Sequence, residues 1–119
     1  MIRTYRLASG RLCRLRAPWL PFVDGYHVLF FPEEQGTPTP EEMDEMARIA
    51  FRAARAVGAR AHDDPECYTV LYNGARARRR PWVHFHLLPA RSVAKKRWAI
   101  ACLCAKRWTR RWARPQETR

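Results

Sequence analysis

The stretch WVHFHLLP, residues 82–89, places two histidines two positions apart in a short apolar run that ends at a proline. Aromatic and β-branched residues of this kind favour a strand, and alternate side chains of a strand face the same way. Trp82, His84 and His86 therefore share one face, while the apolar residues between them share the other. Such a strand can bury its apolar face and leave the histidines facing a ligand. Taken alone, the pair is equally typical of hydrogen-bonded histidines in a core or at a surface, and this alternative stays open.

The rest of the chain supplies further strand-like segments, separated by turns. CYTVLYNG (67–74) ends at Asn73-Gly74, and its short connection to the histidine segment favours an antiparallel pair. Residues 2–7 and 11–17 read as two strands joined around Ser9-Gly10, and HVLFFP (27–32) reads as another. The sequence thus predicts an antiparallel sheet of about five strands.

A main helix is predicted over residues 40–57. Thr39 can cap the free amides, Pro40 suits the first helical position, and Glu42 completes a capping box. Apolar residues then recur at helical spacing, and Gly58 is predicted to end the helix.

Residues 93–113 contain no helix breaker and predict a C-terminal helix. Projection of this segment places the following residues on one face: Trp98, Ala101, Cys102, Ala105, Trp108 and Trp112. Three interpretations stay open: the tryptophan face packs on the sheet or at a dimer interface, it contacts nucleic acid, or it lies on an anionic membrane surface. Together these elements predict one α+β domain over residues 1–119.

The composition limits the class of protein. A hydrophobic fraction of 47% excludes a mainly disordered chain, and the net charge of +12 favours phosphate-bearing or anionic partners. The apolar stretches are too short to cross a bilayer, and the N-terminus lacks the apolar core of a secretory signal. The four cysteines lack the paired spacing of a zinc ribbon. We therefore expect a cytoplasmic protein with reduced thiols and no transmembrane segment.

Four ordered segments over residues 24–90 together resemble the histidine triad (HIT) family. They are DGYHVLFFP, the capped helix that begins TPEEMDEM, YTVLYNG and WVHFHLLP. The resemblance implies a HIT-like fold, a homodimer, and a nucleotide or another phosphorylated small molecule as ligand. It also implies that His84 attacks a nucleotide α-phosphate to form a nucleotidyl-histidine intermediate, and that His86, His27 and Asn73 lie near the phosphates.

The chemistry suits these residue types independently of the family. A neutral imidazole is nucleophilic near pH 7, and its phosphoramidate is reactive enough for water to release it. This two-step route requires no cofactor and no metal. A metal bound by His84, His86 and a third histidine, His27 or His62, is a weaker alternative.

Two departures from the family pattern are evident. Trp82 stands where the signature has its first histidine, and the polar segment before the signature is replaced by ARARRRP (75–81). Arg76 and Arg78, with Arg79 and Arg80 beside them, are therefore candidates to bind phosphate, since guanidinium groups bind phosphate bidentately. A solvated basic loop is the alternative.

The preferred function is a HIT-like hydrolase or nucleotidyltransferase that uses His84. The alternative is a non-catalytic module that binds nucleotide or nucleic acid through its basic loop and C-terminal helix. Loss of turnover in His84→Ala would favour the first, and salt-sensitive nucleic-acid binding that depends on the loop arginines would favour the second.

Overall fold

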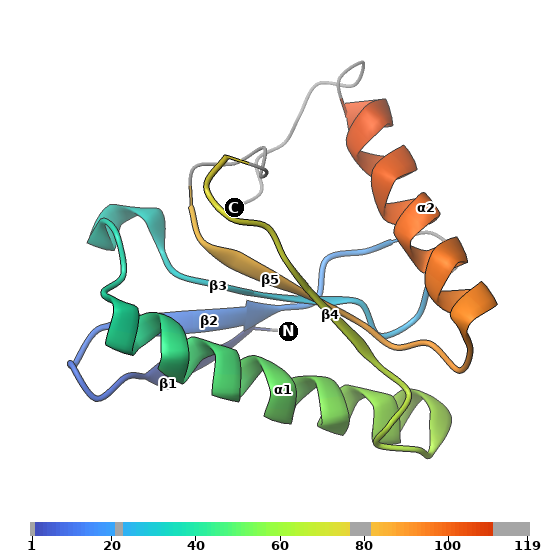
Figure 1. The fold of residues 1–119 in the computed structure, drawn as a ribbon, viewed down its shortest axis with the longest axis horizontal. Coiled ribbons are helices and arrows are strands. Elements are labelled where there is room, and N and C mark those ends of the chain that lie inside the picture. Colours follow the sequence, from blue (N-terminus) through green and yellow to red (C-terminus); the bar gives the residue numbers. More distant parts are fainter. Residues whose placement is uncertain (1, 21–22, 77–81, 111–119) are drawn as a thin grey trace.

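The computed structural model describes residues 2–20, 23–76 and 82–110, which form an α+β fold with a five-stranded antiparallel sheet (Figure 1). In chain order the elements are β1 (Ile2–Arg6), β2 (Leu12–Arg16), β3 (His27–Phe30), the 3₁₀ turn η1 (Glu33–Gln35), α1 (Pro40–His62), β4 (Thr69–Tyr72), β5 (His84–Leu88) and α2 (Val93–Arg110). The strand order is β1-β2-β3-β5-β4, so that β5, the strand of the histidines, lies between β3 and β4. The predicted sheet and both predicted helices are confirmed.

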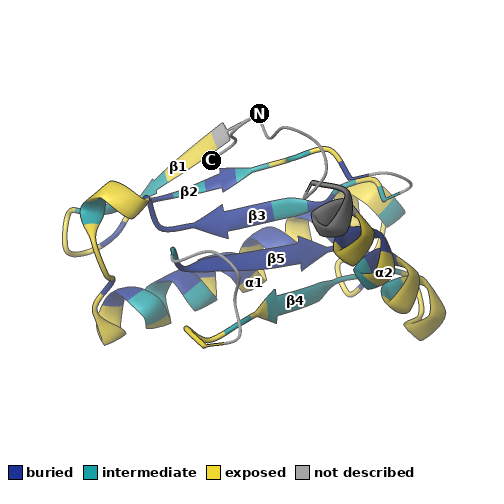
Figure 2. Cartoon of the chain, turned by 90° about the horizontal axis from the view of Figure 1, so that it is seen from above, coloured by how far each residue is buried: buried dark blue, intermediate teal, exposed yellow. Residues whose placement is uncertain are grey.

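The two faces of the sheet are covered differently. Helix α1 lies along one face, and α2 lies over one end of the other (Figures 1 and 2). Val83, Phe85 and Leu87 are buried in the core that α1 covers. The side chains between them face the α2 side, because Val28 and Phe30 lie opposite His86 and His84 in the β3–β5 register and belong to the core on that side. The predicted division of β5 into an apolar face and a histidine face is therefore confirmed.

Helix α1 begins as expected but is longer than expected. The Thr39 hydroxyl accepts from the amide of Glu42, and the Glu42 carboxylate accepts from the amide of Thr39. The predicted end at Gly58 is wrong, because the helix continues to His62 and its C-cap is Asp63, with φ of 59°. A Cβ at Gly58 would lie 2.8 Å from the carbonyl oxygen of Cys67, so this glycine permits close packing of the following loop.

Among its described side chains, helix α2 packs on the sheet through a stripe that shares Cys102 with the predicted face but is otherwise different. Ala99, Cys102 and Leu103 are buried on this side of the sheet, whereas 52% of Trp98 is exposed. The helical period was correct and the buried stripe was displaced by about one residue, because small and aliphatic side chains allow the helix to approach the sheet. The side chains of Trp108 and Trp112 lie outside the described residues. Over the described part of the chain, neither helix is long and apolar enough to span a membrane.

A partly buried ion pair connects the β1–β2 hairpin to the start of α1. The guanidinium of Arg11 donates to both carboxylate oxygens of Glu42, at 3.1 and 2.7 Å. The Ser9 hydroxyl and the amide of Thr39 donate to the same carboxylate. Hydrogen bonds from Arg11 first, then from Ser9 and Thr39, lower the pKa of Glu42 to about 2. This cluster fixes the position of the hairpin relative to α1.

Candidate active site

His84 lies at the start of β5, in the interior of the sheet. Phe30 of β3 is its partner in the sheet register, and only 7% of His84 is exposed. The imidazole Nδ1 of His84 lies 3.0 Å from the backbone carbonyl oxygen of Trp82. A carbonyl oxygen can only accept, so Nδ1 carries the hydrogen and the lone pair of the neutral ring lies on Nε2. The contact with the backbone thus selects the tautomer of His84 that is protonated on Nδ1.

His86 is held beside His84 by a tyrosine. Its Nδ1 lies 2.8 Å from the hydroxyl of Tyr26, and the two rings are stacked, with centroids 5.9 Å apart. The His84 and His86 rings meet edge to face, with centroids 4.8 Å apart. His86 is 8% exposed, so both imidazoles are buried and hydrogen-bonded, as the alternative of core histidines predicts, and little of either ring is open to solvent. Burial and the two Nδ1 contacts fix the orientation of the pair.

Tyr26 was not among the predicted site residues. The same alternation that assigns faces to β5 assigns Tyr26 to the face of Val28 and Phe30, because these positions are two residues apart. A tyrosine hydroxyl buried near imidazoles is an expected hydrogen-bond partner. Reading the alternation one residue back from His27 would have identified it.

Trp82 forms the aromatic boundary of the site. Its ring centroid lies 4.7 Å from that of His84 and 5.4 Å from that of Phe30, with an edge-to-face arrangement toward Phe30. Trp82 therefore shares a face with the histidines, as the alternation predicted. Its indole contributes a donor and a large apolar surface beside His84.

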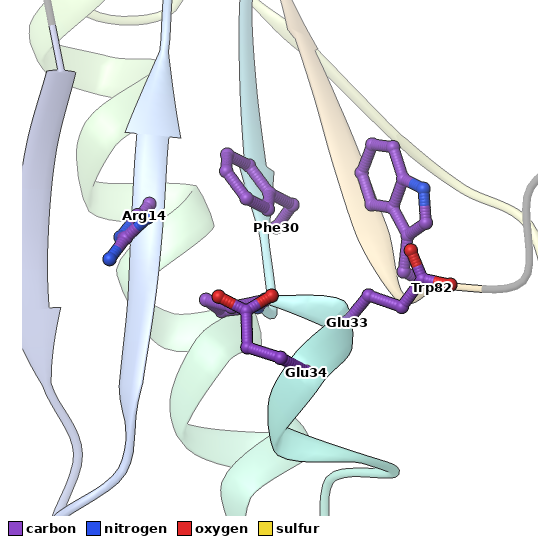
Figure 3. Close-up of a pocket in the computed structure, with 6 residues that line it drawn as sticks. Arg14, Phe30, Glu33, Glu34 and Trp82 are labelled. Carbon is purple, nitrogen blue, oxygen red and sulfur yellow. The ribbon is translucent and has the colours of Figure 1, made fainter. Parts of the chain in front are cut away.

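A hollow of about 140 Å³ opens beside this boundary (Figure 3). It is lined by Arg14, Phe30, Pro32, Glu33, Glu34 and Trp82. Figure 3 shows Phe30 between Arg14 of β2 and Trp82, with the two glutamates coming from η1. The hollow offers aromatic surface, one cation and two carboxylates next to the strand that holds His84.

Asn73 and Arg76 follow β4 on the other side of β5. The β4–β5 register pairs Tyr72 with Phe85, and one further step would bring Asn73 opposite His84. Asn73 is half-buried and Arg76 is exposed. Arg78, with Arg79 and Arg80, lies outside the described residues. The structure therefore brings Asn73 to the level of the nucleophile candidate.

His27 does not share a face of the sheet with His84 and His86, contrary to the expectation from the resemblance. It pairs with Leu87, whose side chain faces α1, so His27 lies on the opposite face of the sheet from His84 and His86. Its Nδ1 lies 2.7 Å from the carbonyl oxygen of Gly25. The neighbouring Tyr26 occupies the histidine face instead, so the structure does not bring His27 together with His84 and His86.

The position of His27 on the other face of the sheet also argues against a metal site formed by His84, His86 and His27. His27 cannot join His84 and His86 across the sheet, and the described part of the chain contains no cluster of three or more histidine, cysteine, aspartate or glutamate side chains arranged to hold a metal ion.

Comparisons with models of protein families, with curated proteins and with solved structures gave no match for this chain.

Proposed function

We propose that the protein is a HIT-like nucleotide hydrolase or nucleotidyltransferase with His84 as its nucleophile. The observation that carries the proposal is the contact between Nδ1 of His84 and the carbonyl oxygen of Trp82, at 3.0 Å. A histidine nucleophile needs one nitrogen held as a donor so that the other attacks. The four sequence segments that resemble the HIT family support the same assignment.

The reaction is a pair of displacements at phosphorus. Nε2 of His84 forms a bond to the α-phosphorus of the nucleotide, and the bond from that phosphorus to the leaving group breaks with its electron pair. Water, or another acceptor, then attacks the same phosphorus and releases the histidine. His86, Asn73 and Arg76 are the candidates to donate hydrogen bonds to the phosphate oxygens as charge develops on them.

The proposal includes a cytoplasmic location and a homodimer. All four cysteines are free thiols, which suits a reducing compartment. The hollow beside Trp82 is the candidate entrance for the substrate because it adjoins the aromatic boundary of His84.

The test is turnover of adenosine phosphoramidate and of a dinucleoside polyphosphate by three proteins. His84→Ala should lower turnover at least about a thousandfold, because it removes the nucleophile. His27→Ala is the matched control, since it deletes an imidazole from the other face of the sheet, and it should keep turnover near that of the parent.

Circular dichroism must show that both variants are folded. Equal turnover in the parent and His84→Ala would refute the proposal. Binding of nucleotide without any turnover in the parent would favour the non-catalytic module.

A further inference from the structure

The N-terminal hairpin carries an unbalanced positive charge. Residues 1–23 contain five arginines and no aspartate or glutamate. Three of these arginines, Arg6, Arg14 and Arg16, share one face of the sheet. In the β1–β2 register Arg14 lies opposite Thr4 and Arg6 lies opposite Leu12, so Arg6 shares a face with Leu12, Arg14 and Arg16. Cys13, between Leu12 and Arg14, faces the other way and is buried in the core that α1 covers. The three arginines therefore lie on the face opposite α1, and we refer to them as the arginine face.

This arginine face is open. In the described part of the chain, α2 buries its residues against β3, β5 and the segment before β3, and no helix lies over β1 and β2 on that side (Figure 2). Arg6 is exposed, and Arg14 and Arg16 are partly exposed. A ligand can therefore reach the guanidinium groups from the solvent.

The acidic groups that contact the hairpin or line the hollow beside it lie toward its turn, where η1 meets Arg11 and Leu12. At its turn, Glu42 binds Arg11, and Glu45 accepts from the amide of Ala8. Near Arg14, Glu33 and Glu34 line the hollow. The arginine face is thus positive along β1 and β2 and meets carboxylates and aromatic rings where it borders the hollow.

We propose that the arginine face binds the backbone of single-stranded nucleic acid, with the partly exposed Trp82 as a stacking surface for a base. Arg14 and Arg16 are two positions apart on a strand, so their Cα atoms are about 6.8 Å apart along it, and each guanidinium can bind a separate phosphate. Basic surfaces beside aromatic rings bind single strands in this way.

The hollow favours single-stranded nucleic acid over a duplex. A base without a pairing partner can stack on Trp82 at the edge of the hollow, and carboxylates accept hydrogen bonds from the amino groups of bases. A duplex would instead bring a second phosphate chain toward Glu33 and Glu34, where like charges repel. The arginine face lies on β1 and β2, so the proposed binding does not require the nucleophile His84.

The test is fluorescence anisotropy with a labelled single-stranded oligonucleotide of about 12 nucleotides, titrated between about 50 and about 200 mM salt. Arg14→Gln/Arg16→Gln removes two charges from the arginine face. Arg48→Gln/Arg52→Gln is the matched control, because it removes two exposed arginines from α1, on the other side of the sheet.

The Arg14/Arg16 variant should bind about tenfold more weakly at the lowest salt, and its slope of log affinity against log salt should be shallower by about 1.4, or about 0.7 for each phosphate contact. The control and His84→Ala should bind like the parent. Retained binding in His84→Ala that has lost turnover would separate this surface from the proposed chemistry.

Three outcomes would overturn the inference. One is an equal loss of affinity in the Arg48/Arg52 control, which would mean that net charge alone drives binding. Another is equal affinity for a duplex of the same length. A third is that Arg14→Gln/Arg16→Gln weakens binding to phosphatidylserine vesicles but leaves oligonucleotide binding unchanged. Thermal unfolding of each variant establishes that the comparison is between folded proteins.

Discussion

Replacing Glu42 by glutamine tests the cluster that joins the hairpin to α1. Glu42 is 2% exposed and accepts hydrogen bonds from Arg11, Ser9 and Thr39. One pKa unit is worth about 1.4 kcal/mol, so a pKa of about 2 in place of 4.5 corresponds to about 3 kcal/mol of stability at neutral pH. The Arg11 side chain is 34% exposed, and screening by solvent lowers the expected loss in Glu42→Gln to about 2 kcal/mol.

The pH dependence gives the sharper result. Because folding lowers the pKa of Glu42, its contribution is fully present above about pH 4.5 and is lost as the pH falls toward 2. Urea unfolding of the parent and Glu42→Gln should therefore give free energies of unfolding that differ at pH 7 and converge in acid. Glu41→Gln, an exposed change in the same helical turn, should alter stability by less than about 0.5 kcal/mol.

Equal losses in Glu41→Gln and Glu42→Gln at pH 7 would refute this reasoning. So would a difference between the parent and Glu42→Gln that stays constant down to pH 3.

Three further outcomes are expected. Trp82→His should raise turnover of adenosine phosphoramidate, because it restores a histidine next to the proposed nucleophile; no gain in a folded variant would mean that the pocket is built for a different ligand. Gly25→Ala should lower the melting temperature, because Gly25 has φ of 86° and a Cβ there would lie 2.8 Å from the side chain of Pro89. In the folded protein Cys104, which is exposed, should react with a thiol reagent before Cys13, since burial raises the pKa of the Cys13 thiol to about 12; the order of labelling by peptide mass spectrometry checks this.

The features predicted correctly from the sequence are those decided by neighbouring residues. Alternation in WVHFHLLP assigned the two faces of β5, and Thr39, Pro40 and Glu42 located the start of α1. Both signals lie within a few positions of the feature that they predict, so tertiary packing did not override them.

The errors arose where distant segments decide the structure. Gly58 resembles a helix end, but the loop at Cys67 packs against it and the helix continues. The buried stripe of α2 depends on which side chains fit the sheet, so Ala99 is buried and Trp98 is not. His27 was assigned by resemblance, and only the register with Leu87 shows that it faces α1.

The candidate site was predicted in part. His84 and His86 are adjacent and on one face, and Trp82 borders them. The role of Tyr26 and the selection of the His84 tautomer by a backbone carbonyl depend on atomic positions that spacing alone does not give.

The most direct test of the account is to trap the covalent intermediate. The parent protein is exposed to a panel of adenosine and guanosine substrates, quenched, and digested under conditions that preserve phosphoramidates. Mass spectrometry should then find a nucleoside monophosphate on the peptide that contains His84, and no such adduct in His84→Ala. An adduct on another residue, or turnover in the parent with the peptide unmodified at every time point, would contradict the assignment of His84 as the nucleophile.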